Sequence, residues 1–359
     1  MTQSLPSDYV PLVRELYKLA AAVHQPVKGT FELTERCNLS CRMCYISHSA
    51  TDAVRRSTEL TAEQWLELAR QAKDSGMVFL LLTGGEVFLR PDFFEIYQPL
   101  TRLGFILTLF TNGTLITESI ASRLAEAPPS WTEVTLYGAT AETYETVTGV
   151  PGSYARCRAG IEALVRQRIP LGLKSTLTRR NVNELEAMRK IAHDEGLPFS
   201  ASWLISKRRD GGSSEATDWR MSAAECIKLE SDNLISSTEL TETVTKESSG
   251  DMNSEKNFYC QAGKATFVIN PYGAMNTCID LTQPAVHPLD IGFSAAWKQV
   301  QHFVDSAPPL DPTCLACEIR SYCPRCPAWS LLETGTLTKP VPYLCEIARA
   351  RKERYAHSA

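Results

Sequence analysis

Cys37-Asn-Leu-Ser-Cys41-Arg-Met-Cys44 is the stretch that decides the fold, with three residues between the first two cysteines and two between the last pair. Three thiolates on one loop can hold three irons of a [4Fe–4S] cluster and leave the fourth iron open to a non-protein ligand. Structural zinc normally takes four protein ligands. No nearby cysteine or histidine completes such a set, because His48 stands isolated on a polar stretch. We therefore expect iron and sulfide here rather than zinc.

The sequence on both sides of this loop alternates between short apolar runs and helical patterns. Strands are expected at 30–34, 77–85, 105–113, 131–138, 171–178 and 199–206, and helices at 61–76, 93–104, 118–127, 153–168 and 183–196. Hydrophobic strands separated by amphipathic helices are typical of a parallel sheet covered by helices. We expect a partial (β/α)6 TIM-like barrel, whose site lies at the C-terminal strand ends. The strand endings Thr-Gly-Gly-Glu, Thr-Asn-Gly and Leu-Tyr-Gly fall at that edge.

The composition excludes several classes of protein. The chain has 359 residues, a net charge of −4 and 22% charged residues, so it lacks the dominant basic field of a nucleic-acid-binding protein. It has no apolar run of about 18 residues to span a membrane and no secretory signal pattern. Its 12 cysteines are clustered, which in a chain of this size without a signal indicates metal binding in a reducing, cytoplasmic compartment.

Five segments are expected along the chain. Residues 1–27 form a helical lead-in, 28–215 the barrel, 216–256 a polar linker or mobile segment, 257–350 a cysteine-rich domain and 351–359 a tail. The linker is expected because residues 231–257 are rich in Ser, Thr and Glu and contain no aromatic residue.

The cysteine triad after the first strand, followed by Gly-Gly-Glu after the second, resembles the radical S-adenosylmethionine (SAM) superfamily. The resemblance runs over about residues 31–206. It implies that the open iron chelates the methionine part of SAM, and that an electron from the cluster cleaves SAM to a 5′-deoxyadenosyl radical. Met43 stands where this family often has an aromatic residue, and Tyr137 where many relatives have an acid.

The same resemblance implies a set of cofactor-binding residues. Gly84, Gly85 and Glu86 match the loop that receives the amino group of SAM. Thr111 and Thr135 match hydroxyl-bearing positions at strand ends, and Lys174 matches a basic residue near the carboxylate of the cofactor.

The C-terminal cysteines resemble the SPASM domain, the auxiliary-cluster extension of radical enzymes that modify peptides. The spacing between Cys323 and Cys326 is two residues where the family has three. Two auxiliary [4Fe–4S] clusters are implied. The first would be held by Cys314, Cys317, Cys323 and Cys345, and the second by Cys260, Cys278 and Cys326.

The second cluster lacks a fourth cysteine in this resemblance. Relatives have one shortly before the position of Cys260, and this chain has none there. Either one iron stays open to a substrate thiolate, or Cys226 fills the gap. The alternative without iron is a pair of zinc ribbons. Cys157 and Cys226 otherwise read as buried small hydrophobic residues.

The expected function is therefore radical modification of a ribosomally made peptide, forming a thioether or a carbon crosslink. The expected partners are the peptide, a leader-binding protein and a reductase such as flavodoxin or ferredoxin, with no nucleic acid and no membrane. Three alternatives remain: oxidation of Ser or Cys to formylglycine as in sulfatase maturases, radical chemistry on a small molecule, and a zinc-bound interaction module without catalysis.

Overall fold

Six parallel strands form the centre of the molecule in the computed structural model, which describes residues 9–46, 48–211, 215–231 and 256–356. They lie side by side in chain order, as expected for a partial (β/α)6 barrel. The strands are β1 (Lys28–Thr34), β4 (Phe79–Gly84), β5 (Ile106–Thr111), β6 (Trp131–Thr135), β7 (Leu171–Thr176) and β8 (Phe199–Ser202).

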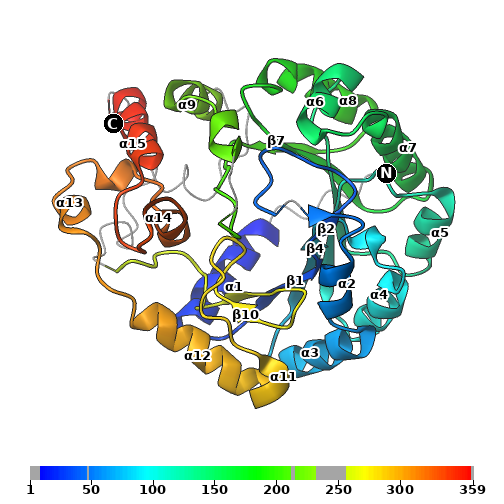
Figure 1. The fold of residues 1–359 in the computed structure, drawn as a ribbon, viewed down its shortest axis with the longest axis horizontal. Coiled ribbons are helices and arrows are strands. Elements are labelled where there is room, and N and C mark those ends of the chain that lie inside the picture. Colours follow the sequence, from blue (N-terminus) through cyan, green and yellow to red (C-terminus); the bar gives the residue numbers. More distant parts are fainter. Residues whose placement is uncertain (1–8, 47, 212–214, 232–255, 357–359) are drawn as a thin grey trace.

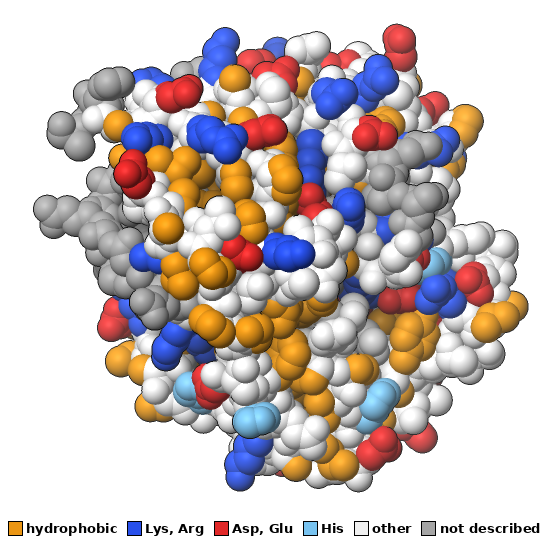
Figure 2. Space-filling model, turned by 60° about the vertical axis from the view of Figure 1, so that its left-hand side comes forward, with side chains coloured by type: hydrophobic (Ala, Val, Ile, Leu, Met, Phe, Trp, Pro, Cys, Tyr) orange, Lys and Arg blue, Asp and Glu red, His pale blue; other side chains and the backbone are white. Residues whose placement is uncertain are grey.

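Helices cover the outer face of these strands (Figure 1). The expected ones are α3 (Ala62–Asp74), α4 (Phe93–Arg102), α5 (Glu118–Glu126), α7 (Ser153–Arg166) and α8 (Leu185–Asp194). A further helix, α6 (Ala141–Thr148), follows β6. Within the described part of the chain, no helix is long and apolar enough to cross a membrane. Positive and negative side chains are intermixed on the face drawn in Figure 2.

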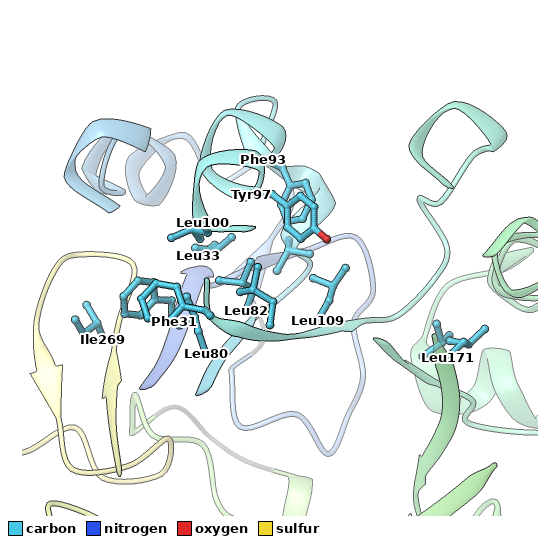
Figure 3. Close-up of a cluster of buried hydrophobic side chains, with 14 of the residues drawn as sticks. Phe31, Leu33, Leu80, Leu82, Phe93, Tyr97, Leu100, Leu109, Leu171 and Ile269 are labelled. Carbon is cyan, nitrogen blue, oxygen red and sulfur yellow. The ribbon is translucent and has the colours of Figure 1, made fainter. Parts of the chain in front are cut away.

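The core lies between the sheet and these helices because alternate strand residues point outward. Leu80 and Leu82 of β4 lie beneath α4, where Phe93 and Tyr97 stack with ring centroids 5.5 Å apart (Figure 3). The residues that alternate with these lie on the other face of the strands, where Glu32 is paired in register with Thr83 and Thr135 with Lys174.

The C-terminal region extends the same sheet, which the sequence did not predict. Strand β9 (Thr266–Ile269) pairs in parallel with the free edge of β1, and β10 (Met275–Asn276) pairs with β9. The sheet therefore has eight strands. A boundary at residue 257 does not divide the molecule structurally, since β9 covers an edge that would otherwise expose unpaired backbone groups.

Part of the predicted linker is wrong. Helix α9 (Ala223–Ser231) packs against α15 (Pro342–Tyr355), and a buried ion pair joins Glu230 to Arg351 at 2.7 Å. Arg351 is only 1% exposed, so the predicted tail at 351–359 is helical and buried where it begins. Because the charges of Glu230 and Arg351 compensate each other in the interior, the polar helix α9 can pack against α15. Residues 232–255 of the predicted linker lie outside the described residues.

Other elements complete the described chain. On the open side of the barrel, opposite α5 and α7, Figure 1 shows α13 and α14. The remaining helices are α1 (Tyr9–Ala22), α2 (Ala53–Thr58), α11 (Pro288–Ile291), α12 (Phe293–Asp305), α13 (Pro312–Leu315) and α14 (Pro327–Thr334). Two short strands, β2 (Arg36–Cys37) and β3 (His48–Ser49), frame the first cysteine loop.

Candidate active site

The first cysteine loop is held by the glycine pair at the end of β4. The Gly85 amide donates to the carbonyl of Thr34 at 2.7 Å, and the Glu86 amide donates to the carbonyl of Arg36 at 2.9 Å. A Cβ atom on Gly85 would lie 2.2 Å from the Arg36 carbonyl oxygen. Only glycine permits this approach, so the pair fixes the backbone that enters the loop.

The three thiols of this loop lie near one another. Burial raises the pKa of Cys37 to about 12 and the pKa of Cys41 well above its usual range, and charge on Cys44 raises the pKa of Cys41 further. The Leu39 amide donates to Cys37 Sγ at 3.4 Å. Thiols with raised pKa values stay protonated until a metal displaces their protons. The loop therefore offers three soft sulfur ligands.

Glu86 ties this loop to the end of β5. Its fully buried carboxylate accepts hydrogen bonds from the Thr111 hydroxyl and the Asn112 amide, both at 2.8 Å. The Asn112 side chain in turn donates to Cys37 Sγ at 3.6 Å. Burial raises the pKa of Glu86 to about 7. Glu86 and Thr111 thus position the cysteine loop, and their contact with the cofactor stays a prediction.

The other two predicted cofactor residues lie on neighbouring strands. Thr135 ends β6 and pairs in register with Lys174 of β7. The Lys174 ammonium lies 3.0 Å from the carboxylate of Glu133 and over the ring of Phe110. Burial lowers the pKa of Lys174 to about 8. Lys174 therefore already has an anionic partner in the barrel, and its predicted contact with the carboxylate of SAM remains a prediction.

The C-terminal cysteines lie near one another, and their division into two cluster-binding groups stays a prediction. Mutual charge effects connect Cys314, Cys317, Cys323 and Cys345, and burial raises the pKa of Cys323 to about 12. One small cavity is lined by four thiols that are widely separated in the sequence: Cys314, Cys323, Cys326 and Cys345.

The second group is Cys260, Cys278 and Cys326, whose pKa values are linked in the same way. Cys226 does not join it, because this buried thiol lies 3.4 Å from the hydroxyl of Tyr343, between α9 and α15. The described residues therefore offer this group three cysteines. Across residues 9–46, 48–211, 215–231 and 256–356, no three Cys, His, Asp or Glu side chains converge closely enough for one metal ion.

A cavity of about 450 Å³ lies between the first cysteine loop and the C-terminal region. Met43 and Cys44 line one side, and Cys326 and Trp329 line another. This volume falls in the usual range for small-ligand sites. Most of the wall is apolar or aromatic: Tyr45, Tyr137, Leu204, Ile205, Tyr259, Ile279, Pro324 and Leu344.

Asp280 is the single carboxylate among the residues that line this cavity in the described chain, and Lys and Arg are absent from that lining. The hydroxyl of Ser206, beyond β8, donates to it at 2.9 Å, and the indole of Trp329, on α14, donates at 3.1 Å. In the sequence, Asp280 is marked only by its position two residues after Cys278. Its contacts with two distant segments required the fold.

Comparisons with known proteins agree with this geometry. Residues 31–191 match the model of the Radical SAM superfamily. The "AdoMet-dependent heme synthase" of Methanosarcina barkeri (strain Fusaro / DSM 804) is 26% identical over 344 residues, which cover 90% of this chain and 98% of the relative. The "PqqA peptide cyclase" of Rhizobium meliloti (strain 1021) is 31% identical over 186 residues, 52% of this chain and about half (49%) of the relative.

A solved structure shows the same fold over nearly the whole chain. Streptococcus suis SuiB bound to precursor peptide SuiA has a TM-score of 0.68 at 15% identity, covering 95% of this chain and 82% of that one. The match over residues 31–191 therefore identifies a Radical SAM domain in this chain, and domains of this kind use a [4Fe–4S] cluster and SAM. The three thiols on one loop fit that cluster, because they leave one iron without a protein ligand.

Proposed function

We propose that this chain is a radical SAM enzyme that modifies a side chain of a peptide. The observation that carries the proposal is the cavity between Cys44 of the first cysteine loop and Cys326 of the C-terminal region. When bound, the cluster supplies the electron that cleaves SAM to a carbon-centred radical. Residues of this chain then bind the substrate, exclude water and orient one carbon toward that radical.

The size and chemistry of the cavity suit one or two side chains of a longer peptide. A volume of about 450 Å³ does not hold a folded domain, and its aromatic wall favours apolar contacts. Asp280 offers a fixed acceptor for a donor on the substrate, such as an amide, a hydroxyl or a thiol. The name of the R. meliloti relative and the peptide in the SuiB structure support a peptide substrate.

A tetrapyrrole is the second candidate, because the M. barkeri relative is named a heme synthase and aligns over 98% of its length. Tetrapyrrole precursors carry several carboxylates, which proteins usually bind through Arg or Lys. The described cavity lining has neither and instead presents Asp280. Haemin titration distinguishes the two candidates: saturable micromolar binding with a Soret shift would favour the tetrapyrrole.

The C-terminal cysteines complete the proposal as a SPASM-type region. The four-cysteine group would hold one auxiliary cluster fully. The three-cysteine group would leave one iron able to take a substrate thiolate, since soft sulfur suits iron. This open site supports thioether formation over oxidation to formylglycine. A reductase such as flavodoxin or ferredoxin, a leader-binding partner and a reducing, cytoplasmic location belong to the same proposal.

The test is co-expression with each short peptide encoded beside the gene, followed by mass spectrometry of the peptide. The proposal expects a mass loss of two hydrogens from one peptide, dependent on Cys37, Cys41 and Cys44. In the Asp280→Ala variant, modification should fall at least about tenfold while deoxyadenosine formation without peptide persists. Unmodified peptides together with tight haemin binding would overturn it.

A further inference from the structure

Arg209 joins the barrel, the first cysteine loop and the C-terminal region through one buried side chain. It follows β8, and only 5% of its side chain is exposed. Its guanidinium donates to the carboxylate of Glu32 at 2.7 Å, to that of Glu35 at 2.6 Å and to the carbonyl of Ile279 at 3.0 Å. Its amide donates to the carbonyl of Tyr45 at 3.2 Å. One residue therefore holds together segments that lie far apart in the sequence.

Two of these contacts reach the wall of the cavity. Tyr45 and Ile279 both line it, and Ile279 directly precedes Asp280, the carboxylate of the lining. The guanidinium of Arg209 lies 5.3 Å from the ring centroid of Tyr45, whose hydroxyl donates to Glu32 at 3.1 Å. Because Arg209 is not itself part of the lining, it acts on the cavity through these two neighbours.

The charges around Arg209 define its position. Glu32 is fully buried, and Glu35 also accepts from the guanidinium of Arg55 at 2.6 Å and from the hydroxyl of Tyr272 at 2.9 Å. The flat guanidinium presents its donors at fixed angles, so binding three acceptors at once restricts it to one orientation. A buried charge that loses its partner is strongly destabilising, which keeps the pair closed. The C-terminal part of the cavity wall is therefore tied to β1.

We propose that Arg209 is a positioning residue that sets the distance between the first cysteine loop and the segment 279–281, and so holds a substrate side chain within reach of the radical. The side chains of Ser206 and Trp329 fix the carboxylate of Asp280, whereas Arg209 fixes the backbone that precedes it. A small displacement of a bound substrate carbon is enough to slow its reaction strongly. The inference rests on the proposed function, because it needs a substrate in the cavity.

The experiment compares wild type with the double variant Arg209→Met with Glu32→Gln, each reconstituted as the full chain. Both charges are removed together, because Arg209→Met alone would leave Glu32 buried without its partner. The kcat for modification of the peptide encoded beside the gene should fall at least about tenfold, with KM little changed. Iron content and deoxyadenosine formation without peptide should match wild type. Also without peptide, hydrogen–deuterium exchange should become faster at the Leu281 amide, which donates to the Cys278 carbonyl at 3.3 Å.

Glu230→Met with Arg351→Met is the matched control, because this buried ion pair hydrogen-bonds to Trp203 and Tyr322, which lie outside the cavity lining. It should leave both kcat and the exchange at residues 279–281 unchanged. A kcat or an exchange rate equal to wild type in the Arg209 variant, or equal changes in the control, would overturn the proposal. A wild type that modifies no peptide would refute the proposed function, and the exchange comparison, which needs no peptide, would still test the role of Arg209.

Discussion

The first cysteine loop and the C-terminal cysteine groups present thiols in two different ways. The loop draws three cysteines from residues 37–44, and the ends of β1 and β4 fix its backbone. The C-terminal groups collect cysteines scattered from Cys260 to Cys345. Cys41 is buried, whereas Cys260 and Cys317 are exposed. The first site is therefore largely local in sequence, and the others depend on tertiary packing.

This difference predicts different responses to perturbation. A local site survives as long as the adjoining strand ends keep their positions. A site assembled from distant segments should lose its geometry when the helices that join those segments separate. Iron content and SAM cleavage report on the two regions separately, so variants can be sorted by the region that fails.

The largest effect is expected when Cys37, Cys41 and Cys44 are all replaced by Ala. The protein should lose deoxyadenosine formation under dithionite completely, and iron should fall from about twelve to about eight atoms per chain, one [4Fe–4S] cluster's worth. Replacing Cys314 and Cys345 by Ala should also remove about four irons but leave SAM cleavage measurable.

Cys157→Ala is the control for that comparison, since Cys157 is fully buried on α7 outside the cysteine groups. Its iron content should match wild type. Iron that is unchanged in the triple variant, or zinc found in its place in wild type, would contradict the assignment of the first loop.

The second prediction concerns the ion pair between α9 and α15. Glu230→Ala leaves the Arg351 guanidinium buried without its partner, which should lower the free energy of unfolding by about 3–5 kcal/mol. Iron should be lost preferentially from the C-terminal groups, because α15 begins three residues before Cys345. Urea unfolding followed by circular dichroism, together with iron analysis, measures both effects.

A double replacement, Glu230→Met with Arg351→Met, removes both charges and should recover much of that stability. The exposed pair between Lys190 and Asp194 provides a comparison, and its removal should leave the free energy of unfolding nearly unchanged. If Glu230→Ala strips iron from the first loop instead, the two regions are not independent.

The third prediction targets the glycine pair that fixes the first loop. Gly85→Ala places a Cβ atom against the Arg36 carbonyl and should destabilise the protein by about 2–3 kcal/mol. The SAM-binding cluster should be lost more readily than the auxiliary iron. Gly196→Ala is the control, because no atom lies within 4 Å of the added Cβ and only the left-handed backbone at φ 69° opposes it. An equal loss of iron in both variants would refute the role of the pair.

The sequence predicted the barrel well because its strands and helices have clear periodicities. Each expected strand corresponds to an observed one, and the spacing of Cys37, Cys41 and Cys44 is a local property. It did not predict β9, since the four residues of this strand do not indicate the strand with which they pair. The sequence also did not predict helix α9, because nothing in its polar residues indicates that one of them pairs with the buried Arg351. The cavity and its carboxylate Asp280 appear only when residues from the barrel and the C-terminal region meet.

The smallest effect is expected at Glu184, which is not one of the predicted cluster ligands or cofactor-binding residues. Its carboxylate accepts hydrogen bonds from the Thr143 hydroxyl at 2.6 Å and the Ala139 amide at 2.6 Å, and so fixes the turn before α6. These bonds hold the pKa of Glu184 below its usual value. Glu184→Gln should lower the free energy of unfolding by about 1 kcal/mol at pH 7, because a charged acceptor becomes a neutral amide.

The pH dependence of that difference follows from its sign. A carboxyl group whose pKa is depressed by folding stabilises the protein above the unfolded pKa, near 4.5, and loses this contribution as the pH falls through the folded pKa. The gap between wild type and Glu184→Gln should therefore be constant from pH 6 to pH 8 and shrink below about pH 4.5. Denaturant titrations over this range measure it. A gap that widens in acid would contradict the hydrogen-bonded carboxylate.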